Sequence, residues 1–65
     1  MAKDKNGVEF AVGQKVKVSA AGPSPWSVHQ AGNYSGKVVN LHEDGPYVET
    51  KDGVICPLAA ECEVV

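Results

Sequence analysis

The sequence predicts a small all-β domain, and three observations lead to this prediction. Valine is the commonest residue, with eleven copies among 65 residues against two leucines and one isoleucine, and β-branched side chains favour strands. Apolar residues alternate with polar ones over short stretches, which is the period of a strand. Seven glycines and four prolines recur along the chain, too often for a long helix.

The first predicted strand begins at Phe10 and ends at Val18. One face of this stretch carries Phe10, Val12, Gln14, Val16 and Val18, whereas the other carries mostly polar residues. The preceding residues 1–7 are polar and end in Asn6-Gly7. This pattern predicts a flexible N-terminal tail over 1–7, followed by one folded domain over 8–65.

Four further strands are predicted over residues 34–41, 47–50, 54–56 and 62–65. Turns are expected at 43–46 and at 51–53, where Gly53 can take the positive φ that a hairpin needs. A single 3₁₀ or helical turn is expected over 57–60. Five short strands, a long first loop over 19–33 and a 3₁₀ turn before the last strand predict a five-stranded SH3-like barrel. An OB barrel would need longer strands and an additional helix.

The predicted core leaves some apolar side chains unaccounted for. The inward positions are Val16, Val18, Val38, Val48, Leu58, Cys62 and Val64, with Phe10 covering one end. Val39 and Leu41 fall on the opposite face from Val38, and Ile55 opposes Val54. Strands that are apolar on both faces indicate a β-bulge or a second buried surface between subunits. The candidate oligomer or pore face is Val39, Leu41, Val54, Ile55 and Cys56.

Composition narrows the classes of partner. The chain has six lysines, no arginine and eight acidic residues, and its acidic C-terminal third argues against nucleic-acid binding. No apolar run is long enough to span a membrane, and no apolar segment follows the first residues, so a cytoplasmic location is expected. Cys56 and Cys62 lack the spacing of a metal or redox motif, which predicts two free, buried thiols.

The loop over 19–33 contains no formally charged side chain and includes the only tryptophan. Trp26 forms an aromatic platform with Tyr34, or it packs over one end of the barrel; the sequence leaves both open. The candidate binding residues are Trp26, His29, Tyr34 and Tyr47. His29 and His42 have no ligand-spaced partners and are expected to be solvated, so no metal site is predicted.

One pair of residues has the chemistry of a nucleophile and its base. Cys56 is the better candidate thiol, and His42 is the one histidine next to a predicted strand. A reactive cysteine needs electropositive surroundings, and this region is acidic. The sequence therefore predicts no catalytic residue.

Much of the chain resembles the type II, trimethoprim-insensitive dihydrofolate reductases. The similar stretches are Phe-Ala-Val-Gly-Gln-Lys-Val-Lys (10–17), Tyr-Ser-Gly-Lys-Val-Val (34–39), Gly-Pro-Tyr-Val-Glu-Thr (45–50) and Ile-Cys-Pro-Leu-Ala-Ala (55–60). The resemblance implies an SH3-like barrel, a homotetramer and a central pore that binds NADPH and dihydrofolate. The family's pore strand reads Val-Gln-Ile-Tyr, whereas this chain has Gly53-Val54-Ile55-Cys56, and the basic residue expected after the first strand is Val18. These departures argue against reductase activity.

Two shorter resemblances point elsewhere. Residues 12–18 with Gly22 and 36–39 resemble the KOW motif, which implies an RNA or protein contact by a similar barrel, although the loop here lacks basic residues. The ending Glu-Cys-Glu-Val-Val (61–65) is similar to that of the small stromal accessory subunit of photosystem I, in which an aromatic pair stands at the place of Trp26.

The sequence therefore favours a non-catalytic binding or assembly module without a cofactor. Its expected partner is a protein or another copy of the chain. The alternatives are a divergent type II reductase-like pore that binds NADPH or folate, and a KOW-like contact with RNA or a transcription factor.

Overall fold

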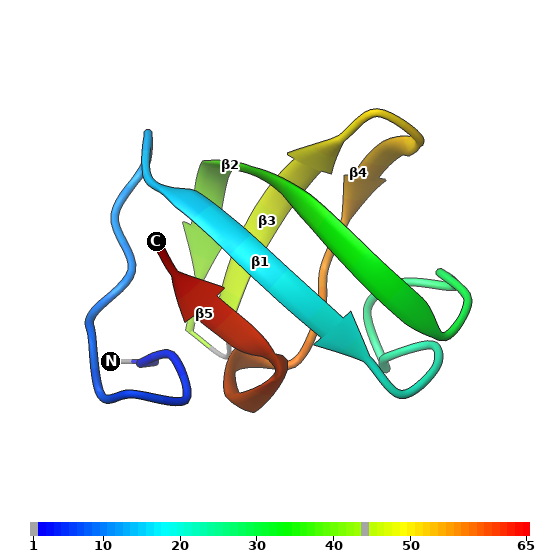
Figure 1. Cartoon of the computed structure of the whole chain (residues 1–65), viewed down its shortest axis with the longest axis horizontal. Coiled ribbons are helices and arrows are strands. Elements are labelled where there is room, and N and C mark those ends of the chain that lie inside the picture. Colours follow the sequence, from blue (N-terminus) through cyan, green and yellow to red (C-terminus); the bar gives the residue numbers. More distant parts are fainter. Residues whose placement is uncertain (1, 44) are drawn as a thin grey trace.

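Five antiparallel strands form one curved sheet in the computed structural model, which describes residues 2–43 and 45–65 (Figure 1). The strands are β1 (Lys15–Ala20), β2 (Gly32–His42), β3 (Gly45–Thr50), β4 (Gly53–Ile55) and β5 (Cys62–Val64), and their order is β4-β3-β2-β1-β5. The 3₁₀ turn η1 (Ala59–Glu61) precedes β5. The all-β prediction is confirmed. Met1 of the predicted tail and Asp44 of a predicted turn lie outside the described residues.

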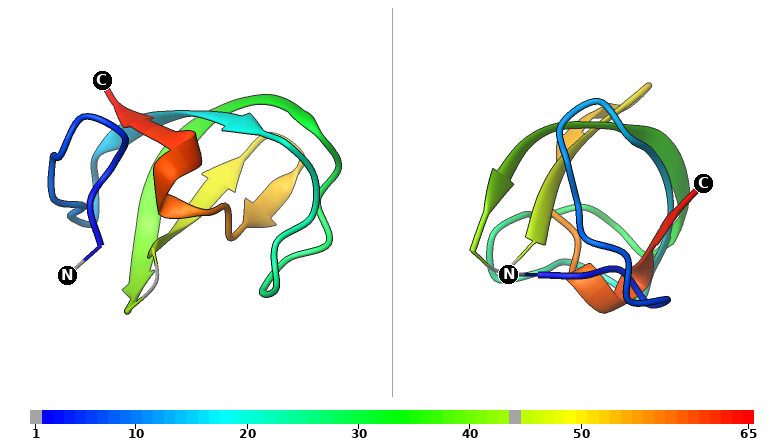
Figure 2. Two further views of the ribbon diagram at one scale, coloured as in Figure 1. Left: turned by 90° about the horizontal axis from the view of Figure 1, so that it is seen from below. Right: turned by 90° about the vertical axis from the view of Figure 1, so that its left-hand side faces the viewer.

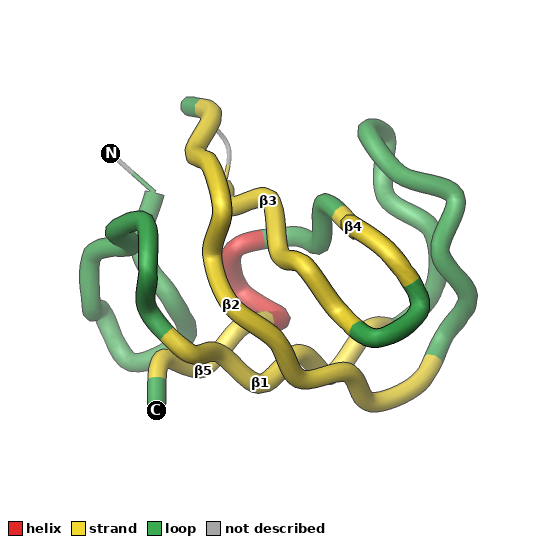
Figure 3. The backbone as a smooth tube through the Cα atoms, turned by 90° about the horizontal axis from the view of Figure 1, so that it is seen from above, coloured by secondary structure: helices red, strands yellow, loops and turns green. Residues whose placement is uncertain are grey.

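The long strand β2 bends the sheet on itself. Its first half, residues 32–37, pairs with β1, and its second half, residues 37–42, pairs with β3. Gly36 lies at this bend, where the chains approach so closely that a Cβ atom would overlap the Glu49 carbonyl. Figures 2 and 3 show the resulting curl, with β3 and β4 folded back towards the turn before β5.

A β-bulge at Val39 resolves the two-sided apolar pattern of β2. Val38 pairs with Val48, but Asn40 pairs with Tyr47, so Val39 is the additional residue. Beyond the bulge, Leu41 pairs with buried Pro46. Pro46 and Val48 are two residues apart and share a face, so Leu41 lies on the same face as Val38 although the two are three residues apart. Of the two explanations that the sequence left open, the bulge is confirmed.

The first strand is shorter than predicted. It begins at Lys15 rather than Phe10 because the chain turns over residues 11–14. The Ala11 backbone N–H donates to Gln14 Oε1 at 2.7 Å, and Gly13 has a φ of 99°, which interrupts an extended chain. Val12 is consequently exposed and does not share the buried face of Val16 and Val18 that the alternation from Phe10 had indicated for it.

The N-terminal segment contacts the last strand. Asp4 is buried, and its Oδ2 atom accepts a hydrogen bond from the Val64 backbone N–H at 2.8 Å. Its Oδ1 atom accepts the backbone N–H groups of Asn6 and Val8. The Lys5 N–H donates to the Cys62 carbonyl at 3.0 Å. The polar residues 1–7 did not predict this packing, because it depends on one aspartate that accepts hydrogen bonds from three backbone N–H groups and not on apolar side chains.

The core lies inside the curl of the sheet. It contains Phe10, Val16, Val18, Ala20, Val38, Val48, Ile55 and Cys62. Six of the eight predicted core and lid residues are therefore buried. Leu58 is exposed because it stands at the N-cap of η1, where the chain turns outward, and Val64 is only partly buried.

Candidate functional site

The loop between β1 and β2, residues 21–31, folds back on the chain near β4 and η1. The Ser24 hydroxyl donates to the Cys56 carbonyl at 2.7 Å, and the Ala21 N–H donates to Glu61 Oε2 at 2.9 Å. A short bridge between Ser24 and Ser27 closes the tip. The outer residues of the predicted loop belong to strands, because β1 ends at Ala20 and β2 begins at Gly32. These hydrogen bonds hold the loop against the chain and thereby fix the position of Trp26.

Three rings form a chain of contacts that we call the aromatic cluster: Trp26, His42 and Tyr47. The ring centroids of Trp26 and His42 are 5.2 Å apart, and those of His42 and Tyr47 are 5.1 Å apart. Both distances are within the range of aromatic pairs. Trp26 retains 45% of its exposure. One side of the indole is therefore available to a ligand while the other rests on His42.

The bulge explains why His42 joins this cluster. After Val39, the even-numbered residues of β2 share the face of Tyr47, since Asn40 pairs with Tyr47 and His42 lies two residues further. Without the extra residue, His42 would point into the sheet interior. The expectation of a solvated His42 is wrong, because the ring is packed between two aromatic side chains.

The thiol of Cys56 lies directly behind the aromatic cluster. Its Sγ atom is 2.8 Å from His42 Nε2, and only 2% of the residue is exposed. Ile55 points into the core, so the next residue along the strand direction points towards His42. The one candidate nucleophile and its candidate base, fourteen residues apart in sequence, are thus in direct contact.

The second cysteine has a different environment. Cys62 is fully buried in the core and its thiol donates to the Leu58 carbonyl. Burial raises the pKa of Cys62 to about 12, with smaller contributions from Glu61, Asp4 and Cys56. Both cysteines are buried thiols, as predicted.

The remaining predicted binding residues form a separate group. His29 and Tyr34 contact each other edge-on with ring centroids 5.9 Å apart. The Tyr34 hydroxyl donates to the Gln30 carbonyl, and His29 Nδ1 is hydrogen-bonded to the Ser27 hydroxyl at 2.9 Å. His29 is 9% exposed, and its Nε2 atom is buried without a hydrogen-bond partner among residues 2–43 and 45–65, so it is not the solvated imidazole that the sequence predicts. Of the four predicted binding residues, Trp26 and Tyr47 therefore lie in the aromatic cluster, whereas His29 and Tyr34 form a separate pair.

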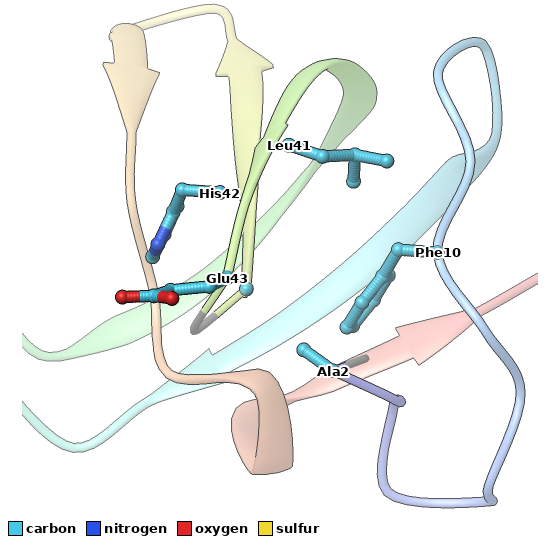
Figure 4. A pocket seen from close by; sticks show the side chains of 6 residues that line it. Ala2, Phe10, Leu41, His42 and Glu43 are labelled. Atoms are coloured by element: carbon cyan, nitrogen blue, oxygen red, sulfur yellow. The ribbon is translucent and has the colours of Figure 1, made fainter.

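A pocket of about 430 Å³ opens beside the aromatic cluster. Ala2, Phe10 and Leu41 give it apolar walls, and His42 and Glu43 project from the end of β2 at its other side (Figure 4). The polar sequence of residues 1–7 gave no sign that Ala2 would close this pocket. His42 belongs to both the pocket and the cluster.

The predicted oligomer or pore face is divided by the fold. Ile55 and Cys56 are buried within the chain itself. Val39, Leu41 and Val54 remain at the surface, each 39–55% exposed. Val54 pairs with Glu49, on the face that also carries Lys37. The surface around Val54 therefore includes charged neighbours rather than a continuous apolar patch.

The described residues and the comparisons with known proteins give no additional assignment. Among residues 2–43 and 45–65, no group of three or more histidine, cysteine, aspartate or glutamate side chains is placed to hold a metal ion. None of the described helical residues forms a helix long and apolar enough to cross a membrane. Comparison with protein-family models, curated proteins and solved structures finds no match to this chain.

Proposed function

We propose that the chain is a small SH3-like module that binds a segment of another protein on the aromatic cluster. The observation that carries the proposal is Trp26, which is 45% exposed and rests on His42. Large aromatic side chains that are held rigidly and left half open are typical of peptide-binding surfaces, because little conformational entropy is lost on binding.

The SH3-like description is supported by topology. The order β4-β3-β2-β1-β5, a long bent β2 shared by two halves of the sheet, and a 3₁₀ turn before the last strand are features of such barrels. The β1–β2 loop carries Trp26 of the aromatic cluster in this arrangement. Loops on a rigid scaffold commonly carry binding residues.

The chemistry of the surface favours a basic, proline-containing peptide. Proline-rich segments form an extended helix that packs on aromatic rings, and lysine or arginine adds a cation–π contact with tryptophan. Glu43 stands at the rim of the adjacent apolar pocket, and the chain carries a net charge of −2. Charge complementarity therefore favours a cationic segment over an acidic one.

The position of Ile55 speaks against a reductase-like pore. Ile55 is the one residue of the family's pore motif that the chain retains, and here it pairs with Val48 inside the core. A pore ligand would need this side chain to be accessible. The binding function is therefore preferred to the enzymatic alternative.

The proposal is tested by the fluorescence of Trp26, the only tryptophan of the chain. The probe is a synthetic peptide with alternating prolines and two lysines, compared with the same peptide carrying glutamates in place of the lysines. We expect the lysine peptide to shift the emission to shorter wavelength with saturation, and to bind at least about tenfold more tightly than the glutamate peptide.

Two variants decide whether the aromatic cluster is responsible, and their binding is followed by calorimetry. Trp26→Ala is expected to abolish binding, whereas Val28→Ala is expected to leave it unchanged, since Val28 is 94% exposed in the same loop. Equal affinity for both peptides, or binding that survives Trp26→Ala, would contradict the proposal. Saturable NADPH binding would favour the reductase-like alternative, and RNA binding that weakens with salt the KOW-like one.

A further inference from the structure

We propose that Cys56 is a nucleophilic thiol, activated by His42, and that its reaction partner is a small hydroperoxide. This modification site goes beyond peptide binding and shares His42 with the aromatic cluster. It is based on the 2.8 Å separation of Cys56 Sγ and His42 Nε2, the packing that fixes the imidazole and the pocket that reaches His42.

The imidazole is held in one orientation by its neighbours. Trp26 and Tyr47 contact the ring of His42, and the Ser24 hydroxyl holds the backbone of Cys56 at 2.7 Å. A base that is fixed within hydrogen-bond distance of a thiol accepts its proton without further rearrangement. The pair thus has the geometry of an activated nucleophile.

The charged and titratable neighbours also bear on this proton transfer. Glu43 follows His42 at the end of β2 and is among the residues that line the same pocket (Figure 4). Tyr47 packs on His42 from β3. Cys62 lies close enough to Cys56 for the two thiols to influence each other electrostatically, but its pKa of about 12 keeps it neutral.

The proposed reaction is balanced in atoms and electrons. His42 Nε2 accepts the thiol proton, and the thiolate attacks one oxygen of hydrogen peroxide. The S–O bond forms as the O–O bond breaks, and the departing hydroxide takes the proton from the imidazolium and leaves as water. Sulfur is oxidised by two electrons to the sulfenic acid, and the peroxide is reduced.

The burial of Cys56 limits the size of the reagents that can reach its thiol. Cys56 is only 2% exposed because the loop that carries Ser24 and Trp26 covers it. Hydrogen peroxide is barely larger than water, whereas aromatic disulfide reagents are much larger. The fold therefore favours small oxidants over bulky thiol reagents.

The test is to treat the folded chain with hydrogen peroxide, trap sulfenic acid with dimedone and locate the adduct by peptide mass spectrometry. We expect the adduct at Cys56 to form at least about tenfold faster than at Cys62, which provides an internal control. The rate at Cys56 should fall less than about threefold between pH 8 and pH 6, whereas that of an ordinary cysteine falls about 80-fold as its thiolate is protonated.

Matched histidine variants separate activation from burial. His42→Gln is expected to lower the rate at pH 6 by at least about tenfold, whereas Val28→Ala, at a position 94% exposed in the loop that covers Cys56, should leave it unchanged. If His42→Gln does not fold, as judged by circular dichroism, the wild-type pH profile decides the question alone. Labelling of both cysteines at one rate, labelling in urea only, or the pH profile of an ordinary cysteine would overturn the proposal.

Discussion

Asp4 connects the first described residues of the chain to its last strand. Its carboxylate accepts backbone hydrogen bonds from Val64, Val8 and Asn6. The bond from the Val64 N–H is the largest cause that lowers the pKa of Asp4, and burial opposes it to a smaller extent. The charged form of this side chain is therefore the one that holds the N-terminal segment in place.

The lowered pKa of Asp4 predicts a specific loss of stability in acid. A carboxylate with a depressed folded pKa contributes its full stabilisation above the unfolded value of about 4, and this contribution is lost as the pH falls through the folded pKa. Urea unfolding should thus show a smaller difference between wild type and Asp4→Asn at pH 3 than at pH 7. Asp52→Asn, an exposed turn residue, is the control, and an equal Asp4→Asn effect at both pH values would contradict the assignment.

Gly36 is required by the close approach of β2 and β3. A Cβ atom at this position would overlap the Glu49 carbonyl and press against the Val48 side chain. Gly36→Ala should destabilise the fold by about 2 kcal/mol or more, because backbone atoms cannot move aside as a flexible side chain can. Thermal denaturation would measure this loss, and Ser35→Ala, the exposed neighbour, should change the midpoint little; equal effects would show that the approach is not tight.

At the scale of elements, the bulge in β2 decides which side chains reach the core and which reach the aromatic cluster. Val38 before the bulge is fully buried, whereas Val39 within it is 40% exposed. Leu41 and His42 then take opposite faces, towards Pro46 and Tyr47 respectively. One additional residue therefore separates the core from the surface that carries the proposed function.

Two neighbouring valines provide a direct test of the bulge. Val38→Ala should cost about 2 kcal/mol, since it removes two methyl groups from a packed core, whereas Val39→Ala should cost less than about 1 kcal/mol. Chemical denaturation of both variants measures the difference. Leu41→Ala separates the bulge from a regular strand. The bulge turns Leu41 to the face of Val38 and predicts a larger loss than Val39→Ala, whereas in a regular strand both side chains would lie on the outer face and both losses would be equally small. Comparable losses at Val38 and Val39 would also exclude the described register.

At the scale of the whole molecule, Ile55 and Cys56 of the predicted oligomer face are buried within one chain and are not exposed to a second subunit. The surface that remains carries charged residues between its apolar ones. The chain has a Cα radius of gyration of 10.0 Å, close to the value of about 11 Å expected for a compact 65-residue domain. Two of the five residues of the predicted face are thus buried within the chain itself.

We therefore predict that the protein is a monomer in solution. Small-angle scattering over a range of concentrations should give a mass near the 6.8 kDa of one chain and a radius close to that of the structure. A constant mass of two or four chains would instead favour the assembly that the resemblance to type II reductases implies. Sedimentation equilibrium provides an independent measurement of the same mass.

Much of the fold was accessible from the sequence because its strands alternate in the period of a sheet. The alternation around Val16 and Val18 and the turn glycine Gly53, with its φ of 114°, were correctly predicted. The predicted start of the first strand was wrong because the Gln14 side chain stabilises a turn at 11–14: its amide oxygen accepts the Ala11 N–H, and its amide nitrogen donates to the Glu9 carbonyl. Such local polar contacts do not alter the spacing of apolar residues, so that spacing does not reveal them.

Only part of the candidate site could be predicted from the sequence. The sequence identified Trp26 and Tyr47, and it named Cys56 with His42 as a pair, but it gave no reason to place all four together. That juxtaposition depends on the bulge register and on where the β1–β2 loop folds back, and both are tertiary features. The surroundings of His29 were missed for the same reason.

The attachment of residues 4 and 5 to residues 62–64 has a mechanical consequence. Asp4 contacts Val64 and Lys5 contacts Cys62, so the two segments run in opposite directions with their free ends on the same side. A force applied between these ends would load the outermost hydrogen bond first and the next only after it breaks. The contacts between residues 4–5 and residues 62–64 should therefore break at low force, while the pairing between β1 and β2 is still intact.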